Sequence, residues 1–388
     1  MAAPPDFSTD RFAVKLGLFY AAYFVFGGVQ LPFFPLWLES RGLDPRTIGV
    51  VIAVPMVVRI IATPIITHQA DRRRALKSTL VLASMAATVA MTVLGLVQGA
   101  PAILLTFIVA AFAFSPVLSL TDAYALNGLT ARGRAYGPVR LWGSVAFIAG
   151  NVGAGFLLEW FAPGFLIWLI VGSLAVSVIA ALALTPVAAA PHAPDAPRAS
   201  PKVLLRNPMF LAIALASGMI QSSHALYYGF STLQWRAAGL DGTIIGLLWG
   251  LGVAAEVALF ALSGRLPAKL RPTTLIAIGA TGAIVRWSAM AFDPPAALLP
   301  VLQLLHGGSF AATHLGLMGF MARGVPRELA ATAQGFVSTW SGLVNASATF
   351  VSGFVYAASG SLAYLVMAAM ATVGLVSALT AARRWQSG

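Results

Sequence analysis

Long apolar segments separated by short polar stretches dominate the chain. A membrane-spanning helix needs about 20 mainly apolar residues, and twelve stretches of the sequence meet this condition. The connections between them are short, so consecutive helices are expected to run antiparallel across the membrane. The predicted spans cover residues 14–38, 48–69, 78–98, 102–126, 138–160, 164–186, 209–234, 243–264, 273–292, 296–321, 330–357 and 361–382.

The longest polar break, residues 188–208, is rich in Pro and Ala and is predicted to be a cytoplasmic linker. It divides the chain into an N-terminal six-helix bundle, residues 1–187, and a C-terminal six-helix bundle, residues 209–388. Gly42-Leu43-Asp44 recurs as Gly239-Leu240-Asp241, in each case just before the second span of a half. This repeat predicts an all-α polytopic membrane protein with two pseudo-symmetric halves, an arrangement typical of transporters.

The positions of Lys and Arg predict the orientation of the chain. If both termini are cytoplasmic, the cytoplasmic segments hold eighteen of these residues and the outer segments only Arg41, Arg46 and Arg236. This bias accounts for the net charge of +12 without a nucleic-acid partner, and it indicates anionic lipid headgroups as the partners of the cations. We therefore expect a multi-pass protein of the cytoplasmic (inner) membrane, and a monomer.

Composition excludes several other classes of protein. The chain is 59% hydrophobic and 9% charged, whereas soluble domains contain about 25% charged residues. It has no cysteine, which excludes disulfides, thiolate metal sites and cysteine nucleophiles. We find no metal-ligand spacing and no Gly-x-Ser-x-Gly nucleophile motif, so neither a metal, a cofactor nor an enzymatic activity is expected. Residues 1–10 lack the features of a signal peptide, and the first span is expected to be retained.

Ionisable residues inside the predicted spans indicate a functional site. A charge at the bilayer centre costs about 2.5–3.5 kcal/mol on insertion scales, so such residues are expected to face a polar cavity or one another. A cavity between the two halves is the favoured interpretation, and a simple ion-pair staple is the alternative. The residues concerned are Arg59, Asp122, Arg140, His224, Glu256, Arg286, His306 and His314.

Roles can be assigned to some of these residues by their chemistry. Asp122 and Arg140 lie near the inner ends of adjacent spans, where they form either a structural salt bridge or a clamp for substrate. Glu256 is the best proton carrier, because burial disfavours its charge and a nearby Arg286 favours it; the alternative is a purely structural pair. His306 is placed to relay the proton, whereas His314 is expected to be an ordinary interhelical histidine.

The sequence resembles the major facilitator superfamily, and within it most closely the 3-phenylpropionate transporter branch, a relative of the lactose permease. The resemblance covers most of the chain. It is carried by Leu31-Pro32-Phe33-Phe34-Pro35, Leu120-Thr121-Asp122, Val139-Arg140-Leu141-Trp142, His224-Ala225, Tyr227-Tyr228-Gly229-Phe230, Gly252-Val253, Val285-Arg286-Trp287 and Leu305-His306.

This resemblance implies the major facilitator fold, with twelve transmembrane helices in two six-helix bundles. It also implies that Asp122 and Arg140 contact substrate, and that Glu256, Arg286 and His306 serve affinity and proton coupling. Three differences from the family pattern limit the comparison. Thr67 and Arg74 replace glycines in the loop after the second span, Phe147 stands where the permease has a tryptophan, and residues 307–313 contain no acid.

The leading hypothesis is a proton-coupled symporter of a small aromatic carboxylate that works by alternating access. Three arginines against two acids leave one excess positive charge in the spans, which favours an anion. The alternatives are a sugar or nucleoside symporter, and, more remotely, a polytopic membrane enzyme or solute sensor. The predicted substrate-binding residues are Tyr23, Arg59, Asp122, Arg140, Phe147, His224, Tyr227 and Tyr228, and the predicted proton-coupling residues are Glu256, Arg286 and His306.

Overall fold

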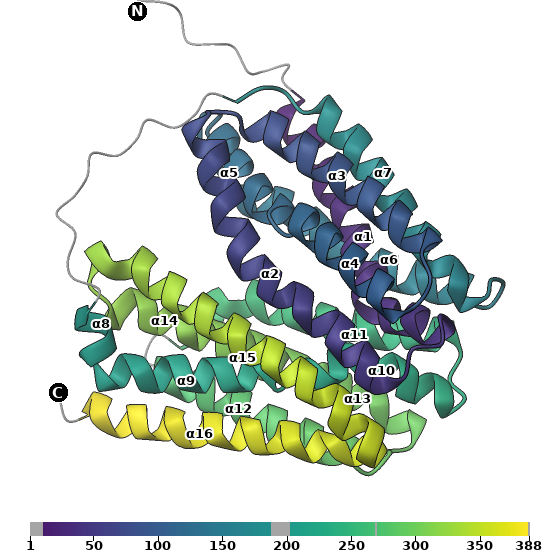
Figure 1. Cartoon of the computed structure of the whole chain (residues 1–388). Helices are drawn as coiled ribbons and strands as arrows, with labels where there is room; N and C mark the ends of the chain where they lie inside the picture. Colours follow the sequence, from purple (N-terminus) through teal and green to yellow (C-terminus); the bar gives the residue numbers. More distant parts are fainter. Residues whose placement is uncertain (1–10, 188–201, 268–269, 387–388) are drawn as a thin grey trace, which may run out of the picture. The chain divides into compact units, whose positions relative to one another are not determined.

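The computed structural model describes residues 11–187, 202–267 and 270–386. These residues form helices joined by short loops, and no strand occurs among them (Figure 1). The N-terminal segment 1–10 and most of the predicted linker, residues 188–201, lie outside the described residues.

The first six spans are seven α-helices, because one predicted span is interrupted. The fourth span breaks at Ser115-Pro116, where proline supplies no backbone N–H to the helix. The helices are α1 (Phe12–Ser40), α2 (Pro45–Arg72), α3 (Leu76–Leu96), α4 (Ala100–Phe114), α5 (Val117–Thr130), α6 (Tyr136–Leu157) and α7 (Leu166–Ala183).

The second six spans contain two interruptions. The seventh span breaks at Ser223-His224, and the tenth contains a π-helical segment, Gly307–Ala312. Such π-helical turns are frequent at functional sites. The helices are α8 (Lys202–Arg206), α9 (Pro208–Ser222), α10 (Ala225–Ala237), α11 (Gly242–Leu262), α12 (Pro272–Met290), α13 (Leu299–His306), α14 (Thr313–Gly324), α15 (Ala330–Ser359) and α16 (Tyr364–Gln386).

Each predicted span coincides with one helix or with one interrupted helix, so the predicted fold class is confirmed. Nine segments of the described chain have the length and apolar composition of a membrane span, and one of them, Thr332–Arg384, covers most of α15 and most of α16. The helices α6 and α12 are not among the nine; they are 22 and 19 residues long, and each carries one arginine within its span.

The chain packs as two compact units. The first comprises Met1–Arg41 and Val58–His192, and the second comprises Gly42–Val57 and Ala193–Gly388. The helix α2 therefore begins in the second unit and ends in the first. The division expected from the sequence, with a linker at 188–208 between bundles at 1–187 and 209–388, stays a prediction.

Small residues bring α1 and α6 together inside the first unit. A Cβ atom at Gly150 of α6 would lie 2.9 Å from the carbonyl oxygen of Val25 on α1, and a Cβ at Gly28 of α1 would collide with the carbonyl oxygen of Phe147. Helix interfaces in membranes use such residues because they allow the backbones to approach closely. Gly28 and Gly150 therefore serve the packing of α1 against α6.

We predict that Gly150→Ala destabilises the protein, because the added methyl group meets rigid backbone of the neighbouring helix. Overpacking of this kind costs about 1–3 kcal/mol, which should lower the midpoint of thermal unfolding in detergent by several degrees. Gly153→Ala is the matched control, since a Cβ there has open space around it. An equal loss of stability in both variants would contradict the assigned contact.

Candidate functional site

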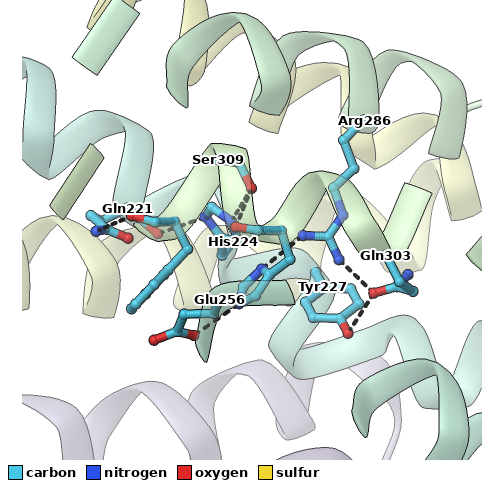
Figure 2. A network of polar contacts seen from close by, with 9 residues as sticks. Gln221, His224, Tyr227, Glu256, Arg286, Gln303 and Ser309 are labelled. Carbon is cyan, nitrogen blue, oxygen red and sulfur yellow. Dashed lines mark hydrogen bonds and ion pairs between the residues drawn. The ribbon is translucent and has the colours of Figure 1, made fainter. Parts of the chain in front are cut away.

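The polar centre of the second unit is the guanidinium group of Arg286 on α12, which is 0% exposed. Its Nη1 lies 2.9 Å from Nδ1 of His306, and its Nη2 donates to Oε1 of Gln303 over 2.7 Å (Figure 2). The guanidinium carbon also lies 4.5 Å and 4.6 Å from the ring centroids of Tyr227 and Trp287. Two neutral acceptors and two aromatic faces therefore surround this cation.

The contact with Arg286 decides the tautomer of His306. An arginine side chain offers only donors, so Nδ1 of His306 must accept the hydrogen bond and the ring proton must sit on Nε2. That nitrogen lies 3.6 Å from Oε2 of Glu256 on α11. Arg286 thus reaches Glu256 through His306.

His224 has the opposite tautomer. It lies at the break between α9 and α10, and its Nδ1 is 3.2 Å from the carbonyl oxygens of both Ile220 and Gln221. Because carbonyl oxygens only accept, Nδ1 carries the proton. Its Nε2 then accepts a hydrogen bond from the hydroxyl of Ser309, 3.0 Å away in the π-helical segment. The two helix interruptions are therefore joined by a histidine–serine contact.

Tyr227 and Tyr228 supply an aromatic wall beside these histidines. The ring of Tyr227 stacks on Trp249 of α11 at 4.5 Å, and its hydroxyl donates to Oε1 of Gln303 over 3.0 Å. Tyr228 is half-buried and stacks on His224 and on Trp249, with centroid distances of 5.8 Å and 5.9 Å. Both tyrosines thus belong to the same cluster as Arg286.

Some residues of this cluster were missed by the sequence reasoning. Gln303 orients Arg286 and Tyr227 through a single oxygen, Ser309 holds His224, and Trp249 supports both tyrosines. Gln303 precedes His306 by three residues, so the two side chains share one face of a helix. That spacing was a usable signal. The sequence offered no comparable signal for Trp249, because most aromatic residues in membrane helices face lipid or pack against other helices.

A second polar group lies in the first unit, around Asp122 of α5. Its Oδ1 accepts hydrogen bonds from the hydroxyls of Tyr20 and Tyr136, over 2.6 Å and 2.8 Å. These two tyrosines come from α1 and α6, so the carboxylate ties three helices together. Asp122 therefore obtains its hydrogen bonds from neutral donors rather than from Arg140.

Arg140 of α6 lies on aromatic rings instead. Its guanidinium carbon is 4.2 Å from the ring centroid of Phe24 and 5.5 Å from that of Tyr20. Gly143 makes room for this arrangement, because a Cβ there would lie 2.9 Å from Nη1 of Arg140. Within the described residues, Arg140 has no hydrogen-bond or ion-pair partner, and the salt bridge to Asp122 considered above is not formed.

The remaining predicted residues of the first unit are more dispersed. Arg59 of α2 is exposed, and the described residues offer it no hydrogen-bond or ion-pair partner. The hydroxyl of Tyr23 donates to the carbonyl oxygen of Phe114 over 2.8 Å, at the break between α4 and α5. Phe147 packs its ring against Gly27, where a Cβ would lie 3.5 Å away. The described residues contain no group of three His, Cys, Asp or Glu that could hold a metal ion.

The Asp122 group belongs to the first unit and the Arg286 cluster to the second. The structure brings together six of the predicted residues in the second unit, and it places Asp122 and Arg140 around the ring of Tyr20 in the first unit. The shared chamber expected from the sequence stays a prediction. The six clustered residues are His224, Tyr227, Tyr228, Glu256, Arg286 and His306.

Known proteins resemble this chain over nearly its whole length. The model of the MFS_1 like family matches residues 13–366. The chain is 33% identical over 365 residues to a probable 3-phenylpropionic acid transporter of Escherichia coli (strain K12), covering 92% of this chain and 94% of that protein. It is 26% identical over 386 residues to a maltose permease of Geobacillus stearothermophilus, covering 95% and 94%.

Solved structures show the same fold. The nucleoside transporter NupG superposes with a TM-score of 0.80 at 17% identity, covering 95% of this chain and 98% of that one. A bacterial homolog of the human lysosomal transporter Spinster gives a TM-score of 0.76 at 12% identity, covering 96% of both chains. The chain is therefore a multi-pass membrane transporter rather than an enzyme, and it belongs to the MFS_1 like family of the major facilitator superfamily.

Proposed function

We propose that this transporter moves a small aromatic carboxylate across the membrane together with a proton. The observation that carries the proposal is Arg140, whose guanidinium lies on the face of Phe24 without a hydrogen-bond acceptor among the described residues. A carboxylate fits such a group, because it accepts two parallel hydrogen bonds from the planar fork of an arginine. An aromatic ring on the substrate fits the neighbouring ring of Phe24, which is half-buried.

The relatives support this substrate class and also name the competing one. A probable 3-phenylpropionic acid transporter is 33% identical to this chain, whereas the maltose permease is 26% identical. A sugar or nucleoside would rely on hydroxyl contacts to Asp122. In the structure Oδ1 of that carboxylate already accepts from two tyrosine hydroxyls. A carboxylate substrate therefore matches Arg140, which has no acceptor among the described residues, better than a sugar or nucleoside matches Asp122.

Glu256 is the proposed proton carrier. His306 directs its Nε2 proton toward Oε2 of Glu256, 3.6 Å away, which stabilises the carboxylate form. Protonation of His306 at Nδ1 would place a proton against the N–H of Arg286, so the histidine is held neutral by that contact. The exchanging proton then resides on Glu256, whose side chain is 22% exposed and thus within reach of water. Alternating access would expose this group to each side of the membrane in turn.

We also propose that the protein lies in the inner membrane as a monomer with both termini cytoplasmic. The distribution of Lys and Arg supports this orientation, because cytoplasmic loops of membrane proteins are enriched in both.

Replacing Arg140 should weaken the apparent affinity for 3-phenylpropionate. A hydrogen bond to a charged group is worth about 1.5–3 kcal/mol, so the KM for uptake by Arg140→Gln should rise about tenfold or more. Arg140→Lys keeps the charge but loses the planar fork of the guanidinium group. Its KM should lie between those of the natural chain and of Arg140→Gln. Uptake into proteoliposomes measures this, with Arg134→Gln, an exposed arginine of the adjacent loop, as the control. An unchanged KM in Arg140→Gln would remove the assigned role.

Glu256→Gln should separate proton coupling from substrate movement. Glutamine resembles the protonated acid and cannot release a proton, so accumulation driven by a pH gradient should be lost while exchange of labelled for unlabelled substrate continues. Glu328→Gln, an exposed acid in the 3-10 turn that precedes α15, is the control. Gradient-driven accumulation at the wild-type level in Glu256→Gln would show that another group carries the proton.

The orientation can be tested with single cysteines, because the natural chain contains none. Gln98 and Ala131 are exposed residues in the α3–α4 and α5–α6 connections, which are predicted to lie outside and inside, respectively. In intact cells a membrane-impermeant maleimide should label Gln98→Cys and leave Ala131→Cys unlabelled until the cells are permeabilised. The reverse pattern would require both termini to lie outside.

A further inference from the structure

An apolar groove runs along the second unit between α9 and α15, away from the residues discussed above. Its volume is about 430 Å³, within the range of ligand pockets. It is lined by Leu205 of α8, by Leu211, Ala214 and Leu215 of α9, and by Trp340 and Leu343 of α15, together with Phe210, Phe336 and Thr339. Thr339 supplies the one aliphatic hydroxyl among these lining residues.

The groove is bounded by the contact between the two helices. The indole of Trp340 packs over Gly218 of α9, where a Cβ atom would lie 2.5 Å from its Nε1. Trp340 nevertheless remains 39% exposed, and Leu205, Leu211 and Leu343 are 50%, 44% and 45% exposed. Apolar side chains exposed on a membrane-spanning unit are suited to contact with lipid hydrocarbon, so an apolar chain matches the lining of this groove.

Two cations lie on α8, the helix that contributes Leu205 to the lining of the groove. Lys202 and Arg206 are exposed, and they are separated by four residues, which places them on the same face of this short helix. Leu205, between them in sequence, belongs to the lining of the groove. Cationic side chains beside a membrane helix attract anionic lipid, each with about 1 kcal/mol. An occupant with an apolar chain and a negative headgroup matches both features.

We propose that the groove holds an acyl chain of an anionic phospholipid, whose headgroup phosphate is bound by Lys202 and Arg206. The site shares no residue with the proposed substrate and proton groups and does not depend on the proposed function. A bound lipid would connect α8, α9 and α15, the three helices that line the groove.

The site can be tested by quenching of Trp340 with brominated lipid, since bromine on an acyl chain quenches tryptophan fluorescence on contact. The full-length protein is reconstituted in phosphatidylcholine with increasing fractions of phosphatidylglycerol that carries brominated chains. The signal of Trp340 is the difference between the natural chain and Trp340→Phe. Quenching of this Trp340 signal should saturate at a low fraction of brominated phosphatidylglycerol. Half-maximal quenching should need a fraction about fivefold or more smaller than with brominated phosphatidylcholine.

Three comparisons make the result specific. Lys202→Gln/Arg206→Gln should abolish the headgroup preference but leave contact with bulk lipid, whereas Arg72→Gln/Arg73→Gln removes two exposed cations elsewhere and should preserve the preference. Ala214→Phe, which fills the groove, should reduce the quenching. Trp160 is 74% exposed, and its own difference signal against Trp160→Phe reports bulk lipid.

The proposal is overturned if Trp340 responds to both lipids as Trp160 does. It is also overturned if removal of Lys202 and Arg206 leaves the preference intact, or if 3-phenylpropionate relieves the quenching, which would identify the groove as a substrate site. Thermal unfolding midpoints show whether each variant is folded. If Ala214→Phe does not fold, Lys202→Gln/Arg206→Gln still tests the proposal.

Discussion

A guanidinium group buried completely within a membrane-embedded unit must find its hydrogen-bond acceptors in the protein, because hydrocarbon offers none. Arg286 engages His306 and Gln303 on the neighbouring span through Nη1 and Nη2 and lies on the faces of two aromatic rings, whereas its Nε has no hydrogen-bond partner among the described residues. Each of these contacts restricts its partner. The amide of Gln303 is oriented, and the ring nitrogens of His306 acquire distinct roles. The chemistry available at Glu256 follows from that restriction, since the proton of His306 is directed toward it.

Helix interruptions occur where the polar groups are. The break at Ser223-His224 gives His224 access to two carbonyl oxygens of α9, and the π-helical segment places Ser309 beside the same ring. In the first unit the hydroxyl of Tyr23 donates to the carbonyl oxygen of Phe114, where α4 ends. Backbone groups released from regular helix hydrogen bonds are costly in a membrane unless a side chain satisfies them. The interruptions and their polar partners therefore depend on each other.

The two units use their cations differently. In the second unit Arg286 is held by neutral acceptors and is inaccessible. In the first unit Arg140 lies on an aromatic face without an acceptor among the described residues, and Asp122 is occupied by two tyrosine hydroxyls. An arginine whose two Nη groups are already engaged can position a proton-carrying acid, whereas one without an acceptor is available to an anionic ligand. This difference is the physical basis for assigning coupling to one unit and carboxylate binding to the other.

The sequence by itself determined the helical spans, the fold class and the small set of ionisable residues at membrane depth. Length and hydropathy report these properties directly, because the bilayer demands about 20 apolar residues for each span. The partner of each polar side chain was decided only by the tertiary structure. Asp122 binds Tyr20 and Tyr136 instead of Arg140, His306 separates Arg286 from Glu256, and Gln303 stands at the centre of the cluster. Such pairings depend on the rotation of each helix about its axis and on close approach at glycines such as Gly143, and neither quantity is encoded in the apolar pattern of a single span.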